Sequence, residues 1–411
     1  MDFIPPIAQR DMRVQTAVSL QEPDRVPFIP TFNNFFQLNY GVSFGESMRD
    51  PSVLGPSVDA VLDRFEPDLV NLPSVFPAPA MERMKSTCAR FPGKLYNLGD
   101  EVPYQYIDKQ FLKDEEFDDF LRDPSWFLFS KVLPRKYAAL EPLAMLNPNS
   151  MCNSVIYALS ALGTPPMQET LQAMIDTGKH IMENLGKVGQ RAVHCVERGF
   201  IPFGGSVCMC PFDEYADHIR GIMEACMDCI EDPERLEKAL EICERHFPTS
   251  IANAKMQKAK YVFVPLHCGM DNFMSLENYK RFYWPGLKKL LNLLIDEGMT
   301  PIVMCEGKYH TRLEVLADVP KGKVIYFFED VDLVKAKEIL GGTACIAGGM
   351  PTEYLMYGDK QRVIDHTKRM IDLLAPGGGY VMSNSLALDQ VKMENMEAWK
   401  DTVFSYGKYL K

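Results

Sequence analysis

The sequence predicts an α/β protein built as a single (β/α)₈ barrel of the TIM type over residues 1–411. Three observations lead to this prediction. Short apolar runs alternate with long amphipathic segments, each expected helix ends at glycine or near proline, and the apolar runs number eight. Alternating helices and strands indicate a parallel sheet, and eight strands favour a closed barrel over an open sheet.

The expected strands lie in eight short stretches spread along the chain. In order they are FIPTF (28–32), DLVNLP (68–73), FIPFGG (200–205), KYVFVPLHCG (260–269), TPIVMCEG (300–307), KVIYFFED (323–330), TACIAGG (343–349) and YVMSNS (380–385). Amphipathic segments such as 169–199, 233–247, 277–298 and 359–379 supply the helices between them. We expect a helical extension before the first strand. Residues 80–155, rich in aromatics, prolines and mixed charge, fit no strand and helix unit and predict an insertion that caps the barrel mouth.

Composition narrows the class of protein. With 46% hydrophobic residues, 24% charged residues and a net charge of -11, the chain is typical of an acidic soluble protein, which excludes nucleic acid and membrane surfaces as partners. No apolar stretch reaches about 18 residues, and the start MDFIPPIAQRDMR lacks the pattern of a signal peptide. Eleven cysteines, an odd number, indicate reduced thiols in a cytoplasmic protein. Together with 24 methionines they suit anaerobic metabolism.

The stretch TPIVMCEGKYH, residues 300–310, ends an apolar strand in Cys305, Glu306 and Gly307. Gly307 marks the point where the chain is expected to turn out of the strand. The carboxyl ends of parallel strands are where ligands bind in barrels. Because side chains alternate along a strand, only one of Cys305 and Glu306 can face the barrel axis.

Four strand-end residues are candidate catalytic or metal-binding groups: His267, Cys305, Glu306 and Cys345. An acid at the end of an apolar strand is costly unless it is paired or ligated, which makes Glu306 a candidate ligand or general acid. The two cysteines are either ligands or small core thiols. His267 is either a site residue or a satisfied core histidine, whereas His310, past the turn, is expected at the surface.

The stretch PTFNNFFQLNYG, residues 30–41, offers a substrate pocket. Its aromatic residues Phe32, Phe35, Phe36 and Tyr40 can line a flat pocket for a ring, and Asn33 or Asn34 can bond the oxygens of that ring. Ordinary core and loop packing is the alternative interpretation.

Five stretches of the chain carry a resemblance to a known family. They are RVQTAVSLQEPDRVPFIP (13–30), PFDEYADHIRG (211–221), MSLENYKRFYWPGLKKL (274–290), VDLVKAKEILGG (331–342) and LLAPGGGYVMSNS (373–385). They resemble the uroporphyrinogen decarboxylase superfamily, whose fold is a (β/α)₈ barrel. That superfamily contains tetrapyrrole decarboxylases and also zinc methyltransferases that work with corrinoid proteins, so the resemblance implies the fold before the reaction.

Departures from two branches of this superfamily narrow the expected reaction. The decarboxylases bind their polycarboxylate substrate through an N-terminal arginine-rich stretch, but no arginine lies between Arg25 and Arg49 here. The methyltransferases that use coenzyme M carry His-x-Cys-Gly at the strand matching VMCEG, where this chain has Met304 and Glu306.

A third branch, the ether-cleaving methyltransferases of anaerobic O-demethylase systems, matches by spacing. Its pattern is an acid, 27 residues, Cys, 39 residues and Cys, which corresponds to Glu277, Cys305 and Cys345. The acid of that pattern is aspartate, and Ser275 in SLEN suggests a helix start that gives Glu277 a structural role. Alignment by the shared glycine favours Glu306 as the site residue, whereas the spacing favours Cys305.

The resemblance implies that this chain moves a methyl group from a small aromatic methyl ether to the cobalt of a cobalamin carried by a partner corrinoid protein. Zinc at the strand ends, held by ligands from Cys305, Cys345, Glu306 and His267, would draw charge from the ether oxygen. A decarboxylase or lyase of a small acid and a non-catalytic ligand-binding barrel are the alternatives. A rival zinc set, Cys208, Cys210, Cys226 and Cys229, is disfavoured because its last pair falls inside an expected helix.

Overall fold

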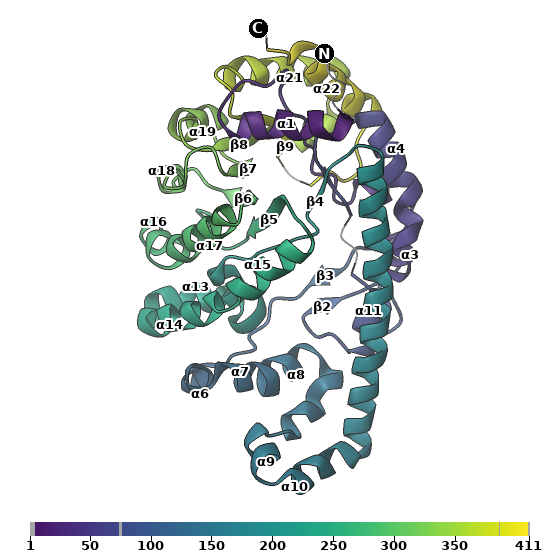
Figure 1. Ribbon diagram of the computed structural model, residues 1–411, viewed down its shortest axis with the longest axis vertical. Helices are drawn as coiled ribbons and strands as arrows, with labels where there is room; N and C mark the ends of the chain where they lie inside the picture. Colours follow the sequence, from purple (N-terminus) through teal and green to yellow (C-terminus); the bar gives the residue numbers. More distant parts are fainter. Residues whose placement is uncertain (1–4, 74–75, 386, 410–411) are drawn as a thin grey trace.

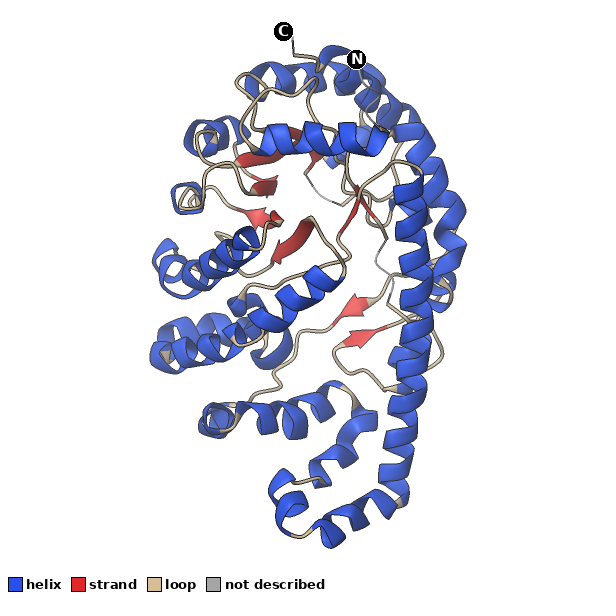
Figure 2. Ribbon diagram, in the orientation of Figure 1, coloured by secondary structure: helices blue, strands red, loops and turns tan. Residues whose placement is uncertain are grey.

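The computed structural model describes residues 5–73, 76–385 and 387–409. Its main sheet has five parallel strands in the order β5-β6-β7-β8-β9. They are β5 (Tyr261–Leu266), β6 (Thr300–Lys308), β7 (Ile325–Asp330), β8 (Cys345–Met350) and β9 (Tyr380–Asn384). Each strand coincides with an expected apolar run, and helices separate them along the chain, which confirms an α/β protein with a parallel sheet (Figure 2).

Three further segments extend the parallel pairing beyond this sheet. Strands β1 (Val70–Asn71) and β4 (Pro202–Phe203) pair with each other. Phe28 forms a parallel bridge to Met382 of β9, and its carbonyl accepts a hydrogen bond from the Asp68 N–H. Val207, just after β4, forms a parallel bridge to β5. These links join all eight expected strand regions side by side, which is compatible with the predicted barrel.

Two apolar layers lie on the two sides of the strands. The inner layer includes Ile29, Leu69, Phe203, Tyr261, Ile302, Phe327, Cys345, Ala347 and Val381, which come from all eight strand regions. The outer layer contains the alternate strand residues together with the apolar faces of the helices. In β6, for example, Ile302 packs in the inner layer and Val303 in the outer one. This period of two is the alternation that strand geometry imposes.

The helices of the chain are mostly short. Before β1 they are α1 (Pro6–Val18), α2 (Phe35–Leu38), α3 (Phe44–Arg49) and α4 (Gly55–Phe65). After β4 they are α12 (Pro211–Tyr215), α13 (Ile222–Glu231), α14 (Pro233–Glu244), α15 (Phe247–Met256), α16 (Leu276–Asn278), α17 (Trp284–Asp296), α18 (Leu313–Leu316), α19 (Leu333–Leu340), α20 (Thr352–Tyr357), α21 (Lys360–Leu374) and α22 (Met393–Tyr406). Within the described part of the chain, no helix has both the length and the apolar character that crossing a membrane requires.

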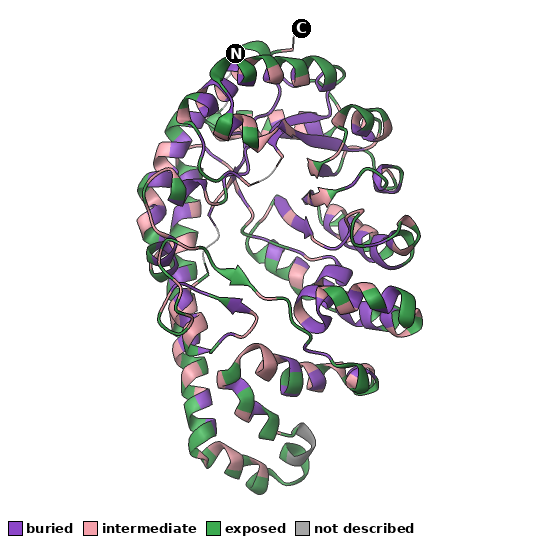
Figure 3. Cartoon of the chain, turned by 180° about the vertical axis from the view of Figure 1, so that it is seen from behind, coloured by how far each residue is buried: buried purple, intermediate pink, exposed green. Residues whose placement is uncertain are grey.

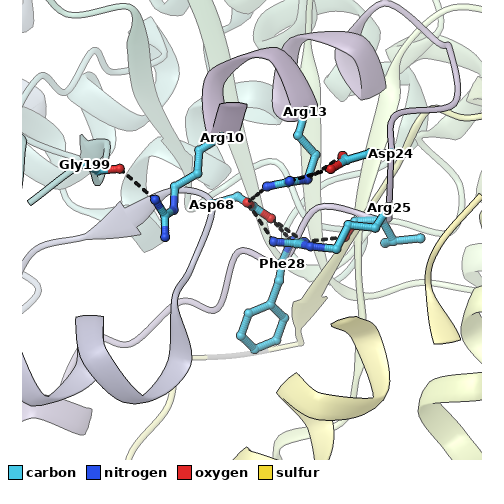
Figure 4. A network of polar contacts seen from close by, with 8 residues as sticks. Arg10, Arg13, Asp24, Arg25, Phe28, Asp68 and Gly199 are labelled. Atoms are coloured by element: carbon cyan, nitrogen blue, oxygen red, sulfur yellow. Dashed lines mark hydrogen bonds and ion pairs between the residues drawn. The ribbon is translucent and has the colours of Figure 1, made fainter. Parts of the chain in front are cut away.

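The N-terminal helix α1 is anchored at the amino ends of the first strands by buried ion pairs (Figure 4). Asp68, just before β1, accepts hydrogen bonds from Arg13 at 2.6 Å and from Arg25 at 2.8 and 3.1 Å. Arg13 also pairs with Asp24, and Arg10 donates to the Gly199 carbonyl just before β4. Because these partners come from three segments outside α1, the network fixes α1 against the strands.

A long excursion connects β1 to β4 and includes the expected insertion. It contains α5 (Ala78–Arg83), the antiparallel pair β2 (Ala89–Arg90) and β3 (Gln105–Tyr106), and then α6 (Phe117–Arg122), α7 (Pro124–Phe127), α8 (Leu133–Lys136), α9 (Pro148–Asn153) and α10 (Val155–Ser160). The chain returns through the helix α11 (Pro165–Glu197), which stands at the outer edge of the molecule (Figure 1). Much of this edge is exposed (Figure 3). The excursion follows no parallel strand and helix pattern, and the capping role of residues 80–155 stays a prediction.

Candidate active site at the carboxyl ends of the strands

His267 directly follows β5 and forms the centre of a cluster of titratable side chains. Its Nδ1 lies 2.5 Å from Oδ2 of Asp217, which is in the short π-helical turn Ala216–Arg220 after α12. Its Nε2 lies 3.8 Å from Oε1 of Glu306. One nitrogen of the ring is therefore fixed by a buried carboxylate, while the other points toward a half-exposed one.

Asp213, one helical turn before Asp217, holds the loop that carries His267. Its side chain is fully buried and accepts hydrogen bonds from the Tyr283 hydroxyl at 2.5 Å and the Cys268 N–H at 2.8 Å. Burial raises the pKa of Asp213 to about 6, in spite of the nearby His267 charge and the Tyr283 hydroxyl. Asp213 and Asp217 both lie in the stretch PFDEYADHIRG, one of the five that carry the family resemblance. Their i, i+4 spacing places both carboxylates on one side of the helix.

Glu306 reaches the cluster because β6 is irregular at its end. The pairing with β7 shifts register between Cys305 and Lys308. Gly307 has φ of +75°, and a Cβ there would lie 2.7 Å from the Met270 sulfur. The Gly307 N–H donates to Oε2 of Glu329 at 2.8 Å. The expected turn at Gly307 is therefore a bulge within the strand, which is a common way to aim a side chain at an active site.

The pKa values of His267 and Glu306 are both raised, that of His267 by its carboxylate neighbours and that of Glu306 mainly by burial. Burial alone would lower the pKa of His267, but the hydrogen bond to Asp217 and the charges of Asp213, Asp217 and Glu306 raise it to about 9. Burial raises the pKa of Glu306, and the charges of Asp213, Glu329 and Asp217 add to this rise against the opposing effect of His267. His267 is thus a cation at neutral pH that faces a carboxyl group with a raised pKa, an arrangement typical of proton transfer.

The expected insertion contributes aromatic side chains to the same place. Tyr106 of β3 donates a hydrogen bond from its hydroxyl to the Asp217 carbonyl at 2.8 Å. The pKa of the neighbouring Tyr104 is raised, first by burial and second by the charge of the nearby Glu306. The Tyr104 ring packs edge-on against Phe76 with 4.7 Å between centroids. These three rings are 41 to 46% exposed, and Tyr104 and Tyr106 come from the expected insertion, whereas Phe76 lies just before it.

A second histidine, His218, lies next to the cluster. Its Nδ1 is 3.2 Å from the Lys136 amino group of α8. Burial and the Lys136 charge lower the pKa of His218 to about 4, so it is neutral at pH 7. Burial also lowers the pKa of Lys136. The two histidines therefore differ in charge because one is bound to a carboxylate and the other to an amine.

Of the four strand-end residues predicted from the sequence, the structure brings together His267 and Glu306 only. Cys305 has no exposed surface and belongs to the outer layer with Tyr279, Tyr309 and Tyr326. Burial raises the pKa of its thiol well above the usual value. Strand alternation, which left Cys305 and Glu306 as alternatives, thus directs Glu306 to the cluster and Cys305 to the helices.

Cys345 lies at the amino ends of the strands, opposite to the carboxyl ends where His267 and Glu306 lie. It is the first residue of β8 and is in register, through Ile325, with Ile302 of β6. Glu306 lies four residues beyond Ile302, about 13 Å further along the strand at about 3.3 Å per residue. Burial raises the pKa of the Cys345 thiol to about 12. The geometry therefore separates both cysteines from His267 and Glu306.

The predicted zinc site does not fit the residues found at the cluster. Among residues 5–73, 76–385 and 387–409, no three His, Cys, Asp or Glu side chains are grouped so that they could hold a metal ion. The rival set is also dispersed into the core, where Cys208, Cys210 and Cys229 are buried. Two protein groups, His267 and Glu306, face each other where the sequence predicted up to four.

The aromatic residues of the 30–41 stretch pack in the core. Phe32 and Phe36 have no exposed surface and pack against each other, and Phe32 also packs with Phe35 and Phe65. The exposed Asn33 accepts a hydrogen bond from Asn71, and Asn34 donates to Asp389. Tyr40, half-buried, stacks edge-on against Phe35. These contacts correspond to the alternative of core and loop packing, and the faces that a ring substrate could contact come from Tyr104, Tyr106 and Phe76.

Glu277 is exposed in the first turn of α16, where Ser275 caps the helix by accepting a hydrogen bond from the Asn278 N–H. This confirms the helix start that the sequence indicated. Sequence reasoning missed Asp213, Asp217, His218, Lys136, Tyr104 and Tyr106. The two aspartates and His218 could have been found, since DEYADH places acids four residues apart next to a histidine after a strand. The residues from the insertion had no such signal, because their approach depends on tertiary folding.

Comparison with known proteins decides the family. A family model described as uroporphyrinogen decarboxylase (URO-D) matches residues 191–406, more than half of the chain. The chain belongs to the uroporphyrinogen decarboxylase family. Among solved structures, a methyltransferase from Methanosarcina mazei is similar with a TM-score of 0.62 and 14% sequence identity, over 97% of this chain and 98% of that one. No curated protein sequence matches this member of the family. The structural likeness extends the shared fold to nearly the whole chain, including the excursion before residue 191.

Proposed function

We propose that this chain is a methyltransferase that moves the methyl group of an aromatic methyl ether to a corrinoid carried by a partner protein. The observation that carries the proposal is the placement of cationic His267 between Asp217 and Glu306, next to the exposed rings of Tyr104 and Tyr106. The methyltransferase from Methanosarcina mazei supports the same class of reaction on a similar fold. We also infer that the eight parallel regions close into one barrel and that residues 80–155 cap its mouth.

The chemistry that this geometry supports is acid-assisted ether cleavage. The reduced corrinoid supplies an electron pair to the methyl carbon, the carbon–oxygen bond breaks, and its electrons move to the aryl oxygen. A phenolate is a poor leaving group unless its charge is neutralised. The proton on Nε2 of His267 can move to that oxygen and give a phenol, while Asp217 stabilises the protonated ring before transfer. Glu306 can return a proton to His267 for the next cycle.

The surroundings of His267 favour a methylated ring over a polycarboxylate. Asp213, Asp217, Glu306 and Glu329 all lie close enough to affect the pKa of Glu306 or His267. Another set of carboxylates would be repelled, and burying each without a guanidinium partner costs several kcal/mol. The rings of Tyr104, Tyr106 and Phe76 instead offer flat apolar contact to an aromatic ring.

Zinc assistance is the other way to activate the ether oxygen, and it stays a prediction that metal analysis can test. No step above depends on it, because no third ligand from the described part of the chain joins His267 and Glu306. The corrinoid is a substrate that the partner protein brings. All eleven cysteines are free thiols, and we place the reaction in a reducing cytoplasm on that basis.

A direct assay tests this function. The purified protein is mixed with methoxybenzenes of varied ring substitution and a cob(I)alamin-bearing protein, and phenol release and methylcobalamin absorbance are followed. We expect equal amounts of both products from at least one ether. Release of carbon dioxide from a small acid would favour a decarboxylase, and binding of aromatics without turnover would favour a ligand-binding barrel. Either result, with no methylcobalamin from a broad ether panel, would overturn the proposal.

A further inference from the structure

The long helix α11 carries a continuous apolar seam that its own chain leaves largely uncovered, although Leu171 at its amino end packs against the buried residues Met84, Leu140, Leu143 and Met167. Residues at alternating spacings of four and three along it are all apolar or glycine: Leu171, Ile175, Gly178, Met182, Leu185, Gly189, Ala192 and Val196. This is the heptad spacing of a coiled-coil seam. It extends over about 38 Å at about 1.5 Å per residue. The seam is partly or fully exposed throughout.

The exposure of the larger side chains is unusual for a helix packed on its own protein. Ile175 is 52% exposed, Met182 74% and Leu185 63%. An ideal Cβ built at Gly178 or at Gly189 meets no atom within 4 Å. A contiguous exposed apolar strip of this length marks an interaction surface.

The other sides of α11 are already assigned. One side packs inward through Thr177, Asn184, Arg191 and Cys195, and Arg191 donates to the Pro51 carbonyl. A second side is polar, with exposed Lys179, Glu183 and Gln190. The apolar seam lies between these two sides of α11, the long helix at the outer edge of the molecule (Figure 1). The helix thus has one side packed on its own chain, one polar side and one apolar side that is exposed.

We propose that two copies of this chain form a dimer by packing their α11 seams against each other in antiparallel orientation. A two-fold axis between Glu183 and Asn184 then pairs the seam with itself in four layers, each occurring twice. The layers are Met182 with Leu185, Gly178 with Gly189, Ile175 with Ala192, and Leu171 with Val196. Every member of the seam meets another member, as the self-complementary interface of a two-fold dimer requires.

Charge and shape agree with a second copy as the occupant. At the polar margin of the seam, Lys179 falls opposite Gly186 of the other copy, so no like charges oppose each other. The glycine layer lets the two backbones approach closely on both sides of the central Met182 and Leu185 contacts. The amino end of α11 leads from α10 and its carboxyl end leads to β4 (Figure 1). Antiparallel pairing therefore keeps the two barrels at opposite ends of the joined helices.

Sedimentation of the full chain at about 20 µM tests this dimer. We expect the wild type to sediment at twice its chain mass of 46.7 kDa. The double substitution Met182→Glu with Leu185→Glu should weaken association at least about 100-fold, because it places four charges in the central layers. Gln190→Glu, an exposed change on the polar side of the same helix, should leave the dimer intact.

Gly189→Glu keeps the test decisive if the double variant folds poorly. This position has free space in the single chain, and replacing a helical glycine favours the helix. It should therefore leave the melting temperature the same or higher while it converts the protein to a monomer. A monomeric wild type, or a dimer that survives Gly189→Glu, would overturn the proposal, as would a wild type that binds the corrinoid partner through this seam in place of itself. The dimer does not depend on the methyl donor, so it can fail while the proposed function holds.

Discussion

The two ends of the strands handle buried charge in opposite ways. At the amino ends, Asp68 has no exposed surface and is saturated by two guanidinium groups and the Phe28 N–H. At the carboxyl ends, one cation, His267, is shared among several carboxylates, and Glu306 is half-exposed and 3.8 Å from its nearest cationic atom. Saturated charges can only hold the fold together, whereas incompletely paired ones remain available to a substrate.

The first prediction concerns the amino ends of the strands, where a substitution removes the charge of Asp68. In Asp68→Asn, Arg13 and Arg25 lose the carboxylate that both contact, so we expect unfolding free energy to fall by about 3–5 kcal/mol. Chemical denaturation monitored by circular dichroism measures this loss. The matched change Asp24→Asn removes a carboxylate that is mostly exposed, and it should cost about 1 kcal/mol or less. Equal losses in the two variants would mean that burial of the network does not determine its contribution.

At the other end, His267→Gln should affect the reaction and spare the fold. The variant cannot donate a proton to the aryl oxygen, so methyl transfer should slow by about 10²–10³, or about 2.7–4 kcal/mol in the barrier. Single-turnover formation of methylcobalamin measures the rate. His310→Gln is the control, because His310 is exposed and its Nε2 lies 3.4 Å from Oδ1 of the surface residue Asp330, away from the cluster around His267. A His267→Gln protein with a normal rate would leave the histidine a structural role only.

Glu306→Gln keeps the size of the side chain and removes its proton exchange. We expect turnover to fall by about 10², with a smaller change in a single turnover, since Glu306 returns the proton after His267 has donated it. Steady-state and single-turnover rates measured on the same samples separate the two steps. Glu277→Gln, exposed at the start of α16, should behave as wild type. Unchanged turnover in Glu306→Gln would show that Glu306 takes no part in the proton transfer.

The sequence predicted the fold more fully than the site because strand patterns are local. Seven of the eight expected apolar runs contain a strand, and the run 28–32 forms an isolated parallel bridge at Phe28. Glu306 lies at the end of TPIVMCEG, where an unpaired acid is costly. Which of Cys305 and Glu306 faces the cluster could not be decided, because the bulge at Gly307 depends on its contacts with β7. The spacing of Cys305 and Cys345 could not reveal that these residues lie on different layers and at different heights of the strands.

The substrate side of the site was harder still to predict. The rings of Phe32 and Phe36 lie in a stretch that would end at the mouth, yet both are buried, and Phe32 packs against Phe65 of α4. Tyr104 and Tyr106 reach the cluster from a segment that shows no periodic pattern. Their position depends on the hydrogen bond from the Tyr106 hydroxyl to the Asp217 carbonyl, which joins residues more than 100 positions apart. No local pattern records such a contact.

The smallest expected effect is that of Asp217→Asn, which tests whether the carboxylates at the carboxyl ends of the strands determine the charge of His267. Asp217 positions His267 and helps to hold its pKa at about 9, so the wild type should keep its donor protonated up to about that pH. Loss of the carboxylate lowers the pKa of His267 toward its ordinary value of about 6.5.

Because the reactive form is the protonated one, the methyl-transfer rate of the variant should begin to fall between about pH 6.5 and 9, where the wild-type rate is still level. At pH 8 the difference should be up to about thirtyfold, and near pH 6 it should nearly vanish. Rate profiles from pH 6 to about 9.5 measure this shift, with Asp330→Asn as a control that removes a surface carboxylate beside His310. Parallel profiles for Asp217→Asn and wild type would mean that Asp217 does not set the charge of His267, and the contrast between the two ends of the strands would then rest on Glu306 alone.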